Sequence, residues 1–300
     1  MHSSIKQRPL QKVLHFFLTK IIVGIAVIVA LVALTELLRS VLLDKTNLSN
    51  DTKAMATSIT EAVIAVAAYI ILYKVYDKRQ IDELSRAKFI SNAITGSMTG
   101  ILLQALFILI IYIAGSYSVA HFNPASTLIT PFAFALAAGF VAEIIMIGIV
   151  FRLLEKQTGT IITLIIFIIL FAVLHVNSKG ATIISIGATA MQAGFMLPAA
   201  YVFSRNLWLP IFIHFGWDFA EPGIFGGINP SSSLTHGLLT SNIAGNSLLT
   251  GGETGPQDSL SSLLLCALLG SLFLLFAKRR NHFIKPQWRK TATNTSINNL

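Results

Sequence analysis

Four side chains in the apolar part of this chain can exchange protons or bind a metal ion. Glu143 lies inside one hydrophobic segment, His175 is near the end of the next, and His214 and Asp218 share a third. A titratable group at membrane depth costs several kcal/mol, so such groups are by default functional. Because four of them lie in neighbouring segments, we expect them to form one catalytic or metal site inside the bilayer.

Two chemistries suit these residue types. His214 and Asp218 are four residues apart and therefore share one face of a helix. A carboxylate can act as a general base toward water, and an imidazole can share that role or polarise a carbonyl group. The set of Glu143, His175, His214 and Asp218 can equally ligate Zn²⁺ or another divalent metal and leave a position open for water. Taken singly, His175 has a structural explanation as an interfacial hydrogen bonder, and Glu143 has one as a packing carboxyl.

The composition places these residues in a membrane protein. Hydrophobic residues make up 54% of the 300 residues and charged residues only 12%, whereas roughly a quarter of a soluble domain is charged. Lipid offers no partners to unpaired backbone groups, so the spans must be helices. We expect an all-α bundle of about eight transmembrane helices, near residues 13–43, 56–76, 92–114, 131–152, 159–178, 180–203, 206–225 and 259–277.

The distribution of charge predicts the orientation. The net charge of +9 comes from short basic clusters beside the spans, such as Lys278-Arg279-Arg280, which is typical of cytoplasmic loops rather than of a nucleic-acid site. We therefore expect a multi-pass protein of the cell membrane with both termini in the cytoplasm. Its expected parts are an N-terminal two-span region with an amphipathic segment (1–90), a membrane core (91–277) and a basic tail (278–300).

The loop 226–258 is rich in Gly, Ser and Asn and contains acids but no Lys or Arg. This composition has two interpretations. One is an exposed linker, and the other is a cap over the outer mouth of the site, because long irregular loops in compact proteins are often functional.

Two sequence patterns indicate a family. The segment from Phe171 to His175 fits Phe-x-x-x-His, and the segment from His214 to Asp218 fits His-x-x-x-Asn with Asp in place of Asn. The chain lacks His-Glu-x-x-His, Gly-x-Ser-Gly and Gly-x-Gly-Asp, which disfavours zincin, rhomboid and presenilin chemistry. From about residue 75 to the last span, the chain resembles the CPBP intramembrane proteases, which include CAAX prenyl proteases and Abi-type proteins.

The first motif of that family, Glu-Glu-x-x-x-Arg, is incomplete here. Ala142 stands where the first Glu belongs and Ile147 where the Arg belongs, so only Glu143 remains. The resemblance implies that the missing Glu would activate water. Neighbouring helical positions point about 100° apart, so Glu143 needs a local rotation or a π-bulge to face the same point. The absence of Arg at position 147 leaves Glu143 without a helical ion-pair partner, so the two departures are consistent with each other.

The resemblance implies an intramembrane endopeptidase that acts on a membrane-associated protein or peptide. Glu143 would be a base or ligand, His175 would help to activate water, and His214 with Asp218 would bind a metal or stabilise the oxyanion. The alternatives are a pseudoprotease that binds membrane proteins without cutting them and a transporter, although the internal repeats of a transporter are not evident. We expect a bacterial membrane, so a prenylated target is not implied, and no nucleic-acid partner.

Overall fold

The fold consists of long apolar helices, as the composition predicts. The computed structural model describes residues 16–226 and 237–288. Within them, six helices are long and apolar enough to span a membrane: Phe17–Leu43, Asn50–Tyr76, Asp82–Ile113, Ala125–Thr158, Ile183–Ser204 and Leu260–Arg279. The chain is thus a multi-pass membrane protein by the length and composition of its helices, and large apolar side chains such as Ile22, Val75 and Ile113 are exposed on its surface.

The other two expected spans are helical but shorter. Helix α7 covers Thr160–His175, and α10 covers Trp208–Phe219 and continues as a π-helix over Ala220–Ile224. Several of the six long segments combine consecutive α-helices with short π-helical or 3₁₀ stretches. The α-helices in them are α2 (Phe17–Leu38), α3 (Asn50–Tyr76), α4 (Phe89–Ile113), α5 (Ile129–Glu143), α6 (Arg152–Thr158), α8 (Ile183–Met191), α9 (Leu197–Ser204) and α12 (Leu260–Arg279).

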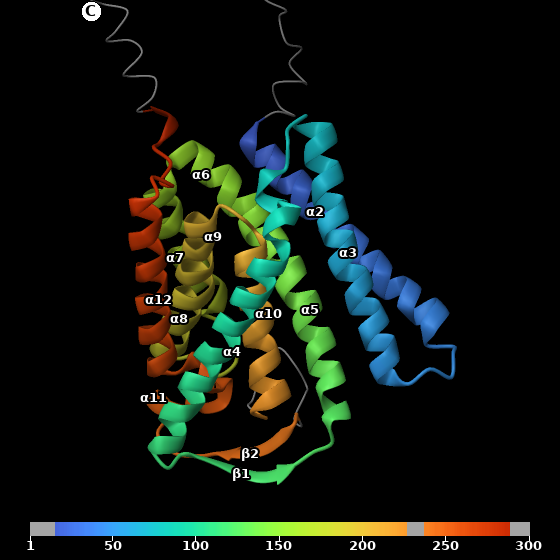
Figure 1. The fold of residues 1–300 in the computed structure, drawn as a ribbon, viewed down its shortest axis with the longest axis vertical. Helices are drawn as coiled ribbons and strands as arrows, with labels where there is room; N and C mark the ends of the chain where they lie inside the picture. The colour runs from blue at the N-terminus through green and yellow to red at the C-terminus, as the bar shows by residue number, and fades with distance from the viewer. Residues whose placement is uncertain (1–15, 227–236, 289–300) are drawn as a thin grey trace, which may run out of the picture.

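The all-α expectation is confirmed for the bundle, and two loops add one small sheet. Strand β1 (Tyr117–Phe122) pairs antiparallel with β2 (Leu239–Ile243), with Tyr117 opposite Ile243. The ribbon lies across one end of the bundle, and α6 lies at the other (Figure 1). We refer to these as the strand end and the α6 end. The pairing joins residues far apart in the sequence, so no local sequence pattern predicts it.

Helix α10 lies in the middle of the bundle, between α4 and α5 (Figure 1). Glycines allow this close packing: a Cβ on Gly100 of α4 would lie 2.2 Å from the Ile213 carbonyl oxygen, and one on Gly216 would lie 2.3 Å from that of Ser97. A Cβ on Gly139 of α5 would lie 3.0 Å from the Ile211 carbonyl oxygen. Small residues of this kind let membrane helices approach at backbone contact, which fixes the part of α10 that carries His214.

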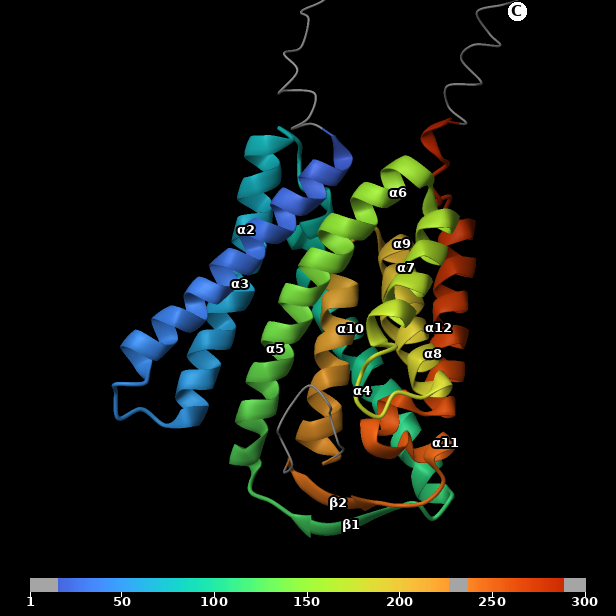
Figure 2. The ribbon, with the colours of Figure 1, turned by 180° about the vertical axis from the view of Figure 1, so that it is seen from behind.

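Helices α2 and α3 form a hairpin on the outside of the bundle, beside α5 (Figure 2). The boundary expected at residue 90 falls in the first turn of α4, and the one at residue 277 falls near the end of α12. The division into three parts remains a prediction from the sequence.

Candidate functional site

Three of the four predicted residues contact one another, with His214 between Glu143 and Asp218. The Nδ1 atom of His214 lies 2.7 Å from Oε1 of Glu143, and its Nε2 atom lies 3.3 Å from Oδ2 of Asp218. All three side chains are buried or nearly so, and Glu143 is only 4% exposed. The sequence placed His214 and Asp218 on one helical face, and the structure brings Glu143 of α5 to the same imidazole.

A π-helix directly after Glu143 accounts for its position. The segment Ile144–Phe151 is π-helical, between α5 and α6. A π-helix has a wider turn than an α-helix and therefore changes the direction of the residues beside it. The local change of helical phase that Glu143 was expected to need is thus present in the chain.

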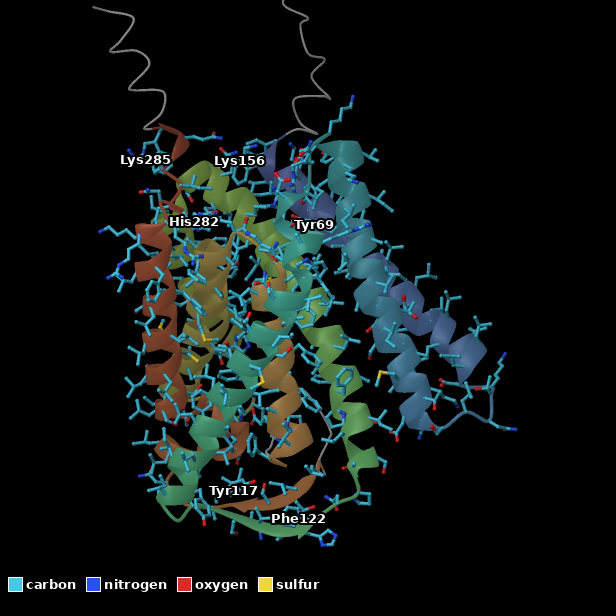
Figure 3. All side chains as sticks on the ribbon, in the orientation of Figure 1. Tyr69, Tyr117, Phe122, Lys156, His282 and Lys285 are labelled. Carbon is cyan, nitrogen blue, oxygen red and sulfur yellow. The ribbon has the colours of Figure 1, made fainter. Side chains whose placement is uncertain are left out.

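Polar side chains at the α6 end bind this π-helix. The Gly148 carbonyl oxygen lies 2.9 Å from Nε of Arg152 and 3.1 Å from the hydroxyl of Tyr69. That hydroxyl also hydrogen-bonds Glu83, which pairs with Arg79. Tyr69 of α3 thus lies at the α6 end of the bundle (Figure 3). Sequence reasoning missed this cluster, although a Glu and two Arg beside apolar segments were a signal for it.

His175 is the last residue of α7, and its tautomer follows from its hydrogen bond. Its Nδ1 atom lies 2.9 Å from the backbone carbonyl oxygen of Phe171. A carbonyl oxygen only accepts, so in the neutral imidazole the proton is on Nδ1. The lone pair is then on Nε2, and that nitrogen is able to accept a proton from water.

His175 and His214 line the same cavity. This cavity has a volume of about 500 Å³, and its lining includes His175, Lys179, Gln192, His214, Asp218 and Asp258. Among the described residues, His214 and Asp218 line it directly, whereas Glu143 contacts His214. The structure therefore brings all four predicted residues to one site, with Glu143 in a supporting position. Gln192, Lys179 and Asp258 are further lining residues that sequence reasoning did not identify.

Part of the loop 226–258 contributes to this cavity. Thr254, Gln257 and Asp258 line it, while residues 227–236 lie outside the described residues. The indole Nε1 of Trp217 donates to Gln257 Oε1 at 3.3 Å, and Thr189 Oγ1 donates to Asp258 Oδ1 at 3.1 Å. The end of the loop is thus folded onto the site, as the cap interpretation expects.

Burial determines the acidity of Asp258, which lies outside the membrane-spanning helices. Loss of contact with water raises the pKa of its carboxyl group. Hydrogen bonds from Thr189 and Thr254 and the charge of His175 act in the opposite direction without cancelling this rise. The carboxylate of Asp258 is therefore a stronger base than that of an ordinary aspartate.

The arrangement does not fit the metal site that the sequence suggested. Both ring nitrogens of His214 face carboxyl groups, so neither offers a free lone pair to a metal ion. In residues 16–226 and 237–288, no three His, Cys, Asp or Glu side chains are placed so that they could hold a metal ion. We therefore derive no step through a metal.

Comparison with known families identifies the central part of the chain. Residues 124–220 match the family model described as type II CAAX prenyl endopeptidase Rce1-like. This range contains Glu143, His175, His214 and Asp218. Searches of curated proteins and of solved structures gave no match.

Proposed function

We propose that this chain, whose residues 124–220 form a domain of the Rce1-like CAAX endopeptidase family, hydrolyses a peptide bond of a membrane-associated protein or peptide. The observation that carries the proposal is a single cavity shared by a histidine with a free basic nitrogen and a histidine held as a donor. These are two of the parts that amide hydrolysis needs, a base for water and a group that stabilises the oxyanion.

His175 is the base in this mechanism. Its Nδ1–H donates to the Phe171 carbonyl, so its Nε2 can take a proton from a water molecule in the cavity. The water oxygen forms a bond to the carbonyl carbon of the substrate as that proton leaves. His175 then gives the proton to the departing nitrogen as the C–N bond breaks, so each atom and charge is accounted for.

His214 stabilises the negative oxygen of the tetrahedral intermediate. The 2.7 Å contact with Glu143 is short and holds the ring. The 3.3 Å contact with Asp218 is longer than a usual N–H···O hydrogen bond. Asp218 therefore holds Nε2–H only weakly, and this group can donate to a substrate oxygen in the cavity while Glu143 stabilises the positive charge on the imidazole.

The cavity also indicates where the reaction takes place. Its lining includes Ser178 and Lys179 after α7, and Thr254, Gln257 and Asp258 from the loop that follows β2. It therefore lies toward the strand end of the bundle. The basic clusters at the α6 end, with Lys156 and Lys285 (Figure 3), support a cytoplasmic position for that end. We accordingly place the cavity toward the outer half of the membrane.

A comparison of membrane-protein termini tests the function. Cells that produce the wild-type chain, His175→Gln or the double variant Ala142→Glu/Ile147→Arg are compared by N-terminal labelling of their membranes. New termini that need His175 would support the protease and name its substrate. If only the double variant produces new termini, the chain is a pseudoprotease that binds membrane proteins without cutting them. An absence of His175-dependent termini contradicts the proposed function.

A further inference from the structure

One acid in the cavity has no role in the steps above. Asp258 lines the cavity together with His175 and His214, yet it comes from the loop between β2 and α12 rather than from a long helix. Its Oδ1 accepts a hydrogen bond of 3.1 Å from Thr189 of α8. Asp258 is half-buried, so its carboxylate loses part of its hydration and its presence here needs an explanation.

The loop holds Asp258 at a defined place. Gly251 has φ +76°, and a Cβ at this position would lie 1.7 Å from the Gly255 carbonyl oxygen, so only glycine fits. The side chain of Gln257 is bound to Trp217, which follows His214 on α10 by three residues. The segment that carries Asp258 is thus attached both to α8 and to the helix of the site.

Two other acids at the site, Glu143 and Asp218, are already engaged with His214. Glu143 Oε1 contacts His214 at 2.7 Å, and Asp218 Oδ2 contacts the second nitrogen of the same ring at 3.3 Å. Position 142, one residue before Glu143, is alanine. Of the described acids that line the cavity, Asp218 and Asp258, the latter makes no contact with His214 within ion-pair distance.

Asp258 and His175 line the same cavity from different segments. A positive charge on His175 lowers the pKa of the Asp258 carboxyl group, so the two groups attract each other once His175 is protonated. When Nε2 of His175 accepts a proton, the imidazole becomes positive. A nearby carboxylate stabilises that charge, and it also accepts the second hydrogen of a water molecule held between the two.

We propose that Asp258 is a further catalytic residue, which holds the attacking water beside His175 and stabilises the imidazolium that forms. This inference rests on the proposed function. In the step, one water proton moves to His175 Nε2, the other remains hydrogen-bonded to Asp258, and the water oxygen attacks the substrate carbonyl. The carboxylate is unchanged at the end, and His175 returns its proton to the departing amine.

The test uses the full chain in proteoliposomes and a peptide that contains the cleavage site found by the terminal comparison. The variants are Asp258→Asn, Asp258→Glu and, as a matched control, Glu253→Gln, which removes an exposed acid from the same loop. Asparagine retains an oxygen for the Thr189 hydrogen bond but no charge. We expect kcat of Asp258→Asn to fall by about 10²-fold with KM little changed, since base catalysis contributes factors of this size.

Each outcome decides one question. A retained carboxylate in Asp258→Glu should recover part of kcat, and Glu253→Gln should match the wild type. If Asp258→Asn cleaves within about threefold of the wild type, Asp258 is not catalytic, although the protease stands. Equal losses in Asp258→Asn and Asp258→Glu with lowered melting temperatures indicate a structural role and overturn the inference. If the wild type shows no His175-dependent cleavage, the proposed function fails first.

Discussion

Glu143 and His214 are 71 residues apart in the sequence, yet Oε1 of the first lies 2.7 Å from Nδ1 of the second. Because Asp218 lies on the other side of the ring, the imidazole of His214 is held between two carboxyl groups. In the proposed mechanism, a chain with alanine at position 142 therefore uses Glu143 to hold His214 rather than to activate water.

Removal of the charge on Glu143 should therefore impair cleavage without disrupting the fold. Glu143→Gln keeps an oxygen that can accept from His214 Nδ1–H, but it no longer stabilises a positive imidazole. We expect kcat to fall by about 10²-fold or more, as for the loss of other acid–base partners. The measurement is the rate of peptide cleavage in proteoliposomes.

Glu61→Gln is the matched control for this variant. Glu61 is another buried acid, 7% exposed, but it lies on α3 near Glu36 and Arg39. Its neutralisation should leave kcat within about twofold of the wild type, because it does not line the cavity that the described residues form. A comparable loss in both variants would show that buried charge in general, and not the contact with His214, supports activity.

The helices and the polar residues at membrane depth could be predicted from the sequence. Apolar length predicted the six long helices, and the cost of placing Glu143 and His214 at membrane depth marked them as candidates for a site, which remains a prediction. The family resemblance was confirmed for residues 124–220. Helical spacing also placed Asp218 next to His214, because residues four apart share a face.

Other features depend on contacts that no local pattern encodes. The pairing of β1 with β2 joins the loop between α4 and α5 to the loop between α10 and α12. Asp258 lies in a Gly-rich loop whose composition also fits a linker, and its position depends on Thr189 and Trp217, which belong to other helices. The predicted zinc set was plausible by residue type, but the ring nitrogens of His214 face carboxyl groups instead.

The hydroxyl of Tyr69 should matter more than that of Tyr73. Tyr69 contacts the Gly148 carbonyl of the π-helix and the Glu83 carboxylate, whereas the buried hydroxyl of Tyr73 has no hydrogen-bond partner within the described structure. We expect Tyr69→Phe to lower the free energy of unfolding by about 1–3 kcal/mol, because it removes a buried hydrogen bond to the charged Glu83 and one to the Gly148 carbonyl. Tyr73→Phe should be neutral or stabilising.

Thermal unfolding in detergent measures both tyrosine variants, and the cleavage rate provides a second readout. If the π-helix positions Glu143, Tyr69→Phe should also lower kcat. Equal melting temperatures for Tyr69→Phe and Tyr73→Phe would contradict the role of Tyr69 in stabilising the π-helix.

The crossing of α4 and α10 should tolerate no side chain at Gly216. An added Cβ would lie 2.3 Å from the Ser97 carbonyl oxygen, so one of the two backbones has to move. We expect Gly216→Ala to destabilise the protein by about 1–3 kcal/mol, as for other overpacked sites. Gly187→Ala is the control, because its Cβ would meet only the flexible end of Leu263. Similar melting temperatures for the two variants would show that the crossing is loose.

Metal content provides a further test of the donor arrangement. Because both ring nitrogens of His214 face carboxyl groups, we expect purified wild-type protein and His214→Ala to contain the same small amount of zinc. Elemental analysis of both proteins in the same buffer measures this amount. One metal ion per wild-type chain, lost in the variant, would show that the side chains rearrange to bind it.

The last prediction concerns the stability of the cap as a function of pH. Burial raises the pKa of Asp258 above that of an aspartate in the unfolded chain. The folded state therefore binds more protons between the two pKa values, and stability falls as the pH rises through this window. Above the raised pKa, Asp258 is ionised in the folded protein, and the lost hydration of its carboxylate then lowers the free energy of unfolding by the full amount.

Asp258→Asn removes that cost and keeps the acceptor for Thr189. We expect its melting temperature to exceed that of the wild type at pH 7 and the difference to vanish below about pH 4, where aspartate is protonated in both states. Glu253→Gln, at an exposed position, should show no such pH-dependent difference. A variant that is more stable but slower than the wild type is expected where a charge is kept for function. A melting temperature below that of the wild type at pH 7 would instead mean that Asp258 stabilises the loop.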